Sequence, residues 1–237
     1  MRRLAWLLCL LTASVAGHAG EAPRFVERSL QRHGVNYRYQ VFVPDGWTAK
    51  RDWPVVLFLH GSGERGSDNR AQLSQCGRPW LAQHGADFPA VVVIPQAPDD
   101  AAWHGEIEQM ALQALDDSIG EWHGDRRRLY LTGLSMGGYG VWDALARKPE
   151  LFAAAVSVCG GGDIETAERI KEIPVWLFHG DQDGAVPVSR SRDMVAALRK
   201  AGAHPKYTEY PGVGHNSWDA AYKDADMHAW LFAQKRK

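Results

Sequence analysis

Short apolar runs alternate with amphipathic segments along most of the chain. Most of the runs show no in-and-out alternation, which is typical of strands buried on both faces of a parallel sheet. They cover residues 37–44, 54–60, 90–96, 128–135, 153–162, 174–181 and 205–211.

Helical patterns fill the intervals between these runs. In the clearest one, Ser189 can cap the first turn and Gly202 can end the last. Strand–helix alternation predicts an α/β layer fold with right-handed crossovers. The expected helices cover residues 106–123, 136–148, 164–172, 189–202 and 218–235.

The interval between the runs at 153–161 and 174–180 is short. About a dozen residues suffice for one short helix and leave no room for a helical cap domain. We therefore expect a mostly parallel central sheet flanked by helices, with the carboxyl edge of the sheet open at this point.

Composition and charge narrow the class of protein. The chain has 237 residues, a formal net charge of -1 and 45% hydrophobic residues. This balance favours one globular domain and gives no field that would attract nucleic acid. The spacing of histidines and cysteines resembles no common metal motif, so we expect neither metal nor cofactor.

The N-terminus has the pattern of a secretory signal. Arg2 and Arg3 precede the apolar run 4–11, which is too short to span a bilayer, and small residues follow it. We expect a signal peptide at 1–19, a single domain at 20–237, export to the periplasm or beyond, and no membrane span. A buried N-terminal helix is the alternative.

Two cysteines, Cys76 and Cys159, remain after the signal. Export permits a disulfide between them, and two buried free thiols are the alternative. The sequence decides neither this question nor the oligomeric state.

A lone serine lies between glycines directly after the run at 128–134. The stretch Gly133-Leu134-Ser135-Met136-Gly137 fits G-x-S-x-G, in which a tight strand-to-helix turn exposes the serine hydroxyl. The glycines leave room for that turn, and the Met136 N–H at the helix start can donate to an oxyanion. Ser135 is therefore a candidate nucleophile.

A serine hydroxyl needs a base that removes its proton, and in this order of elements an acid and then a histidine follow. His215 lies in a glycine-rich turn after the run at 205–211. Asp181 and Asp183 both follow the run at 174–181, and either can supply the carboxylate. The other carboxylate can brace the loop.

A second oxyanion donor is expected in the loop at 60–66. Backbone N–H groups there can face the site, and Ser62 is the candidate donor through its backbone. His60 at the strand end is expected to brace the loop. Glu64 and Arg65 are expected to form an ion pair, with substrate binding as the alternative.

With these motifs in order, the sequence resembles the α/β-hydrolase superfamily. It is most similar to small, uncapped bacterial esterases of the dienelactone hydrolase and carbohydrate-esterase kind, often grouped with prolyl-oligopeptidase-like peptidases. The resemblance runs from about residue 37 to the C-terminus. The segments that carry it include "LFLHGSGERGSDN", "LTGLSMGGYGVWDALARKPELF", "VWLFHGDQDGAVP" and "YTEYPGVGHNSW".

The resemblance implies a Ser135–Asp183–His215 triad, because the pattern HGxxDxxVP selects Asp183. It also implies oxyanion donors at Met136 and in the 61–63 loop. Dienelactone hydrolases proper use a cysteine nucleophile, so the serine argues against that activity.

The implied reaction is hydrolysis of a small-molecule or polymer-attached carboxylic ester through an acyl-enzyme. Feruloyl, acetyl-sugar and polyester substrates all occur in the group. A serine peptidase is one alternative, although the chain has no room for a gating domain. A non-catalytic binding protein on the same fold is another. Aromatic residues expected near the rim are candidates for substrate binding or for core packing: Trp80, Trp103, Tyr139 and Trp218. Trp218 lies three positions after His215.

Overall fold

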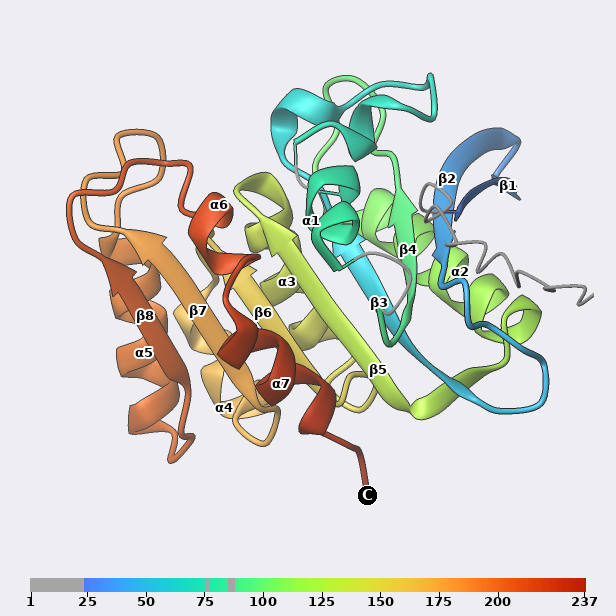
Figure 1. Ribbon diagram of the computed structural model, residues 1–237. Helices are drawn as coiled ribbons and strands as arrows, with labels where there is room; N and C mark the ends of the chain where they lie inside the picture. Colours follow the sequence, from blue (N-terminus) through green and yellow to red (C-terminus); the bar gives the residue numbers. More distant parts are fainter. Residues whose placement is uncertain (1–23, 76, 85–87) are drawn as a thin grey trace, which may run out of the picture.

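The computed structural model describes residues 24–75, 77–84 and 88–237, which fold around an eight-stranded sheet (Figure 1). The strand order is β1-β2-β4-β3-β5-β6-β7-β8. β2 runs antiparallel to both β1 and β4, and every pair from β4 to β8 is parallel, so the predicted mostly parallel sheet is confirmed. The strands are β1 Arg24–Arg32, β2 Val35–Val43, β3 Trp53–Leu59, β4 Val91–Pro95, β5 Gly124–Leu134, β6 Ala154–Val158, β7 Val175–Gly180 and β8 Lys206–Tyr210.

Helices cover both faces of this sheet (Figure 1). One apolar cluster joins the sheet to α2 Gly105–Glu121, α3 Met136–Arg147, α4 Ala167–Ile170 and α5 Ser189–Lys200. A second cluster on the other face joins it to α1 Gly77–His84, α6 Trp218–Ala221 and α7 Ala225–Ala233. β3, β4, β6 and β7 are buried along their whole length because both faces are covered.

Three elements differ from the expectation. β1 and α1 were not predicted, and Leu30 is the one buried residue of the nine in β1, which lies at the sheet edge. The segment 218–235, expected as one helix, is divided into α6 and α7. The division falls at Asp224, whose side chain caps α7 by accepting from the backbone N–H groups of Asp226 and Met227.

The segment between β6 and β7 is as short as predicted. It holds a 3₁₀ turn, η4 Ile164–Thr166, and the one-turn helix α4. None of the helices in the described part of the chain has the length and apolar character that crossing a bilayer requires. The expected signal peptide at 1–19 lies outside the described residues and remains a prediction. Cys76 also lies outside them.

Candidate active site

Ser135 lies on a sharp turn between β5 and α3. Its φ of +52° and ψ of -117° place it in a region that residues with a side chain rarely adopt. A Cβ atom at position 133 would lie 2.4 Å from the carbonyl oxygen of Gly137, and one at position 137 would lie 1.9 Å from that of Leu59. Both glycines of the motif are therefore needed to bring α3 against the end of β3.

The loops after β7 and β8 are joined to each other. The Gln182 N–H donates to the Val213 carbonyl at 3.0 Å, and a Cβ at Gly180 would lie 2.2 Å from the same oxygen. Asp181 Oδ1 accepts from the Gly212 N–H at 2.7 Å, so Asp181 braces the loop that carries His215.

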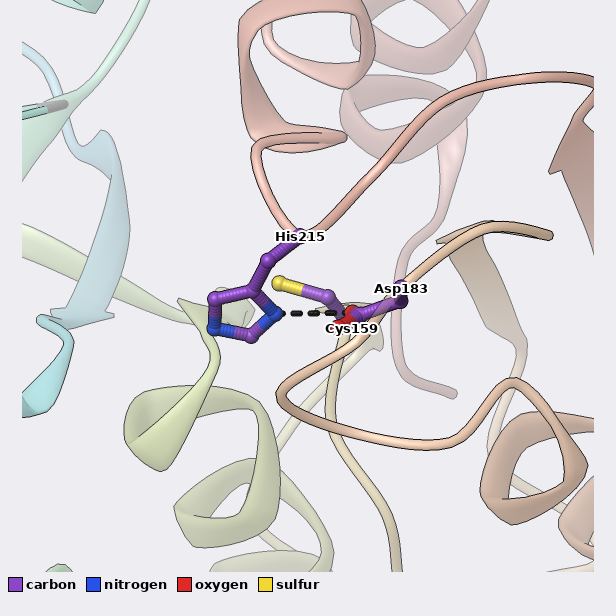
Figure 2. A group of neighbouring side chains, drawn as sticks. All are labelled: Cys159, Asp183 and His215. Atoms are coloured by element: carbon purple, nitrogen blue, oxygen red, sulfur yellow. Dashed lines mark hydrogen bonds and ion pairs between the residues drawn. The ribbon is translucent and has the colours of Figure 1, made fainter.

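Ser135, His215 and Asp183 form a continuous hydrogen-bonded chain. His215 Nε2 lies 2.9 Å from Ser135 Oγ, and His215 Nδ1 lies 2.7 Å from Asp183 Oδ2. Figure 2 shows the imidazole and the carboxylate facing each other, with the Cys159 sulfur directed toward the imidazole. The structure thus brings together the three side chains that the sequence nominated, and among the two candidate acids it places Asp183 on His215.

The carboxylate of Asp183 is held on both oxygens. Its side chain is fully buried, and Oδ1 accepts from the N–H groups of Ala185 and Val186, both at 2.9 Å. Burial raises the pKa of Asp183, but the hydrogen bond from His215 and the two backbone hydrogen bonds outweigh burial, and the pKa lies below its usual value. Asp183 is therefore ionised at neutral pH and can orient the imidazole.

Sequence reasoning missed a second histidine beside this acid. His179 is fully buried at the end of β7, and its Nε2 lies 3.2 Å from Asp183 Oδ2 and 3.0 Å from the Val186 carbonyl. Its Nδ1 pairs with the Ser191 hydroxyl at 2.7 Å. His179 thus packs the acid from the side opposite to solvent. Its place four residues before Asp183, on the same strand end, was the signal available.

Cys159 is a buried free thiol that lies next to Asp183 and His215. One ligand atom from each of Cys159, Asp183 and His215 lies within 4.8 Å of the others. Burial raises the pKa of the thiol to about 12, so it stays protonated at neutral pH. A protonated thiol is a poor metal ligand, and the carboxylate and imidazole beside it are hydrogen-bonded to each other.

The loop after β3 borders Ser135. A Cβ at Gly61 would lie 3.8 Å from the Ser135 Cβ, and the short 3₁₀ helix η1, Ser62–Glu64, follows. Ser62 and Met136 are the first residues of η1 and α3, where a backbone N–H has no acceptor within its own helix. Both predicted oxyanion donors therefore lie at helix starts, one directly after Ser135 and one in the loop that borders it.

His60 braces this loop, as expected. Its buried imidazole accepts from the Ala97 N–H through Nε2 at 3.0 Å, which leaves the proton on Nδ1 to donate to the Gly61 carbonyl at 2.6 Å. Burial lowers its pKa to about 4, so the ring is neutral.

The expected ion pair between Glu64 and Arg65 is not formed. Arg65 Nε donates to the Ala101 carbonyl at 2.5 Å. Glu64 is instead buried, with 1% of its surface exposed, and its carboxylate accepts from two backbone N–H groups. Adjacent opposite charges suggested a surface pair, but the turn of η1 directs the two side chains to different partners.

A mostly apolar cavity of about 400 Å³ opens beside Met136. Trp103 forms part of its wall although it is almost fully buried, and its Nε1 donates to the His60 carbonyl. Tyr139, one turn along α3, is 37% exposed and reaches the same cavity. The lining is Ala102, Trp103, His104, Met136, Tyr139, Gly140 and Asp143.

The other two aromatic residues divide between site and core. Trp218 meets the His215 ring edge-on, with centroids 5.3 Å apart. Trp80 was expected near the rim, but it is buried in the second apolar cluster and donates to His228 Nε2. The helix α1, which the sequence did not predict, accounts for this difference because it packs Trp80 against the sheet.

Known proteins with related sequences and structures include several esterases. A probable carboxylesterase of Oryza sativa subsp. japonica is 27% identical over 203 residues, which cover 73% of this chain and 86% of that protein. A thermostable esterase of known structure is 37% identical with a TM-score of 0.84, over 90% of this chain and 63% of the esterase chain. A ferulic acid esterase is 18% identical with a TM-score of 0.73, over 88% and 98% of the two chains.

The chain covers less than two thirds of some of its relatives. The chain spans 63% of the thermostable esterase and only 21% of an uncharacterized secreted protein of Arthroderma benhamiae that it also matches. The sequence profile of the Dienelactone hydrolase family matches residues 95–231, which are more than half of the chain and include β5, β6, β7 and β8. With its α/β-hydrolase fold, the chain belongs to the dienelactone hydrolase family.

Proposed function

We propose that this protein is a serine carboxylesterase that hydrolyses carboxylic esters through an acyl-enzyme. The hydrogen-bonded chain from Ser135 through His215 to Asp183 is the observation that carries the proposal. The esterase relatives support it, and the presence of all three hydrogen-bonded side chains argues against a non-catalytic binding protein on the same fold.

In the proposed reaction, His215 Nε2 takes the proton of Ser135 as Oγ attacks the ester carbonyl carbon. The carbonyl oxygen becomes an oxyanion between the N–H groups of Met136 and Ser62. The tetrahedral intermediate collapses, and His215 passes its proton to the departing alkoxide, which leaves as the alcohol. Water, deprotonated by His215, then attacks the acyl-enzyme; the bond to Ser135 Oγ breaks, His215 returns the proton to Oγ, and the carboxylic acid leaves.

Esters with a bulky or aromatic acyl group fit the site best. The cavity beside Met136 carries Trp103 and Tyr139 on its walls, and Trp218 packs edge-on against His215. The short segment between β6 and β7 leaves the edge uncovered, which suits esters attached to a polymer such as feruloylated or acetylated polysaccharide or a polyester. Export of the protein, expected from residues 1–19, suits the same substrates.

The test is hydrolysis of nitrophenyl and feruloyl esters by the wild type and by Ser135→Ala. We expect kcat to fall by about 10³-fold or more, because removal of a nucleophile leaves only binding and the oxyanion hole. A fluorophosphonate probe should label the wild type alone. Ser189→Ala, at an exposed helix start, is the matched control and should keep both activities.

The same assay distinguishes the peptidase alternative. Peptidyl and aminoacyl anilides with matching acyl groups are compared with the esters on the wild type. Higher kcat/KM for the amides than for the esters would reject the carboxylesterase and favour the peptidase. Undiminished ester hydrolysis by Ser135→Ala would reject the serine mechanism.

A further inference from the structure

The buried carboxylate of Glu64 has no role in the reaction described so far. Its Oε2 accepts from the Gly61 N–H and its Oε1 from the Gln75 N–H, both at 3.0 Å. Burial raises its pKa to about 7, and the two backbone hydrogen bonds oppose that shift. A buried acid with this environment destabilises a fold when it ionises, so its presence beside the reacting serine calls for another explanation.

The contacts of Glu64 fix the backbone directly before Ser62. Gly61 is the N-terminal cap of η1, and its N–H is bound by the carboxylate. Its carbonyl accepts from His60 Nδ1 at 2.6 Å and from the Glu64 N–H at 3.2 Å. Hydrogen bonds therefore hold both the N–H and the carbonyl of Gly61.

These hydrogen bonds determine where the Ser62 N–H points. The Gly61 carbonyl and the Ser62 N–H belong to one planar trans peptide, so they point in opposite directions. A carbonyl held toward His60 directs the N–H away from His60. A Cβ at Gly61 would lie 3.8 Å from the Ser135 Cβ, which shows how close this peptide lies to the nucleophile.

We propose that Glu64 is a positioning residue of the esterase, which holds the Gly61–Ser62 peptide so that the Ser62 N–H is aimed at the oxyanion formed on attack by Ser135. The inference rests on the proposed function. Glu64 touches neither substrate nor the reacting atoms, and it acts through the backbone of Gly61. Its second contact, to the Gln75 N–H, anchors the carboxylate to the chain beyond η2, Ala71–Leu73.

The test is Glu64→Gln, because an amide has one oxygen and can accept only one of the two N–H groups. We expect kcat for a nitrophenyl ester to fall by about 10- to 100-fold, with KM changed less than about twofold. A donor misplaced by a fraction of an ångström weakens the hydrogen bond to the oxyanion, which forms only in the transition state. Rates are expressed per active site, counted by complete fluorophosphonate labelling.

A pair of inhibitors separates positioning from general damage. A trifluoromethyl ketone forms a hemiketal with Ser135 whose oxyanion occupies the same place as that of the substrate. Its Ki should rise by the factor by which kcat/KM falls, while the Ki of the matching non-electrophilic carbinol stays within about twofold. Glu64→Asp, which keeps the charge on a shorter arm, should show the same split and serves if the glutamine variant does not fold.

Glu108 provides the matched control. It is also a buried glutamate, but it pairs with Arg147 at the far end of α3, about 16 Å along the helix from Met136. Glu108→Gln should lower the melting temperature and keep kcat within about twofold. Wild-type kcat and ketone affinity in Glu64→Gln would overturn the proposal, as would equal losses for ketone and carbinol. Activity in Ser135→Ala would instead overturn the proposed function, whatever Glu64 does.

Discussion

Ser135 holds a backbone conformation that is costly for any residue with a side chain. Its φ of +52° is tolerated because Gly133 and Gly137 remove the atoms that would collide. The motif was readable in the sequence for this reason, since glycine spacing records a steric need directly. The one signal for His179 was its place four residues before Asp183, and this signal is weak because a buried histidine at a strand end belongs to no characteristic motif.

The two aspartates after β7 provide a test at the residue scale. Asp183→Asn should lower kcat by about 10³- to 10⁴-fold, because an amide can hold His215 in the wrong tautomer. Asp181→Asn keeps an oxygen for the Gly212 N–H and should stay within a few-fold of wild type. Ester hydrolysis with circular dichroism as a folding check measures both, and equal losses would contradict the assignment of Asp183 as the acid.

At the scale of elements, α3 approaches the sheet unusually closely. A Cβ at Gly138 would lie 2.7 Å from the Val158 carbonyl, and one at Gly160 would lie 2.4 Å from the Gly138 carbonyl carbon. The first turn of α3 therefore rests on the ends of β3 and β6 with no side chain between them. This contact sets the height of Ser135 above the sheet.

Gly137→Ala should destabilise the fold by about 3 kcal/mol, because the new methyl group would meet the Leu59 carbonyl at 1.9 Å and the backbone must move. Urea unfolding measures the change. Gly46→Ala, where a Cβ meets nothing within 4 Å, is the control and should stay within about 0.5 kcal/mol of wild type. A neutral Gly137→Ala would show that α3 can withdraw from β3 without cost.

Buried strands and long helices were predictable from sequence, whereas the edge strand β1, the helix α1 and the break before α7 were not. β3, β4, β6 and β7 are buried throughout and consist mostly of apolar residues, because both faces are covered. β1 is mostly polar and depends on pairing with β2, so its pattern carries no signal of burial. The break before α7 depends on a single capping aspartate within an otherwise continuous helical pattern.

At the scale of the molecule, parallel strands carry the whole site to one edge of the sheet. In the proposed mechanism, the nucleophile follows β5, the acid follows β7, the base follows β8 and the oxyanion loop follows β3. Strand order brings Ser135 within hydrogen-bond distance of His215, 80 residues away along the chain, and the sequence predicted the class of sheet that does so. The ordering of the side chains around Glu64 was not predictable, because it depends on the direction of one turn.

Glu64 also makes the stability of the molecule depend on pH. Its pKa is raised from 4.5 to about 7 in the folded state, so the folded protein binds more protons than the unfolded chain between these values. Stability therefore falls as the pH rises through this window. The loss approaches about 3 kcal/mol above pH 7.

Urea unfolding of the wild type and Glu64→Gln at pH 4.5 and pH 8 measures this term. Glutamine cannot titrate, so the variant should lose about 3 kcal/mol less than the wild type across the interval. All other groups are shared and cancel in the comparison. Parallel pH profiles for the two proteins would mean that the folded carboxyl titrates normally.

The cavity beside Met136 and the proton relay are built from different segments of the chain. Ala102 and Tyr139 come from the loop before α2 and from α3, whereas Asp183 and His215 follow β7 and β8. Under the proposed function, exchange at the first pair should change the acyl group that is accepted and leave the hydrogen-bonded relay unchanged. A mutant library confined to Ala102 and Tyr139 can therefore be selected for a different ester substrate while the catalytic residues stay unchanged.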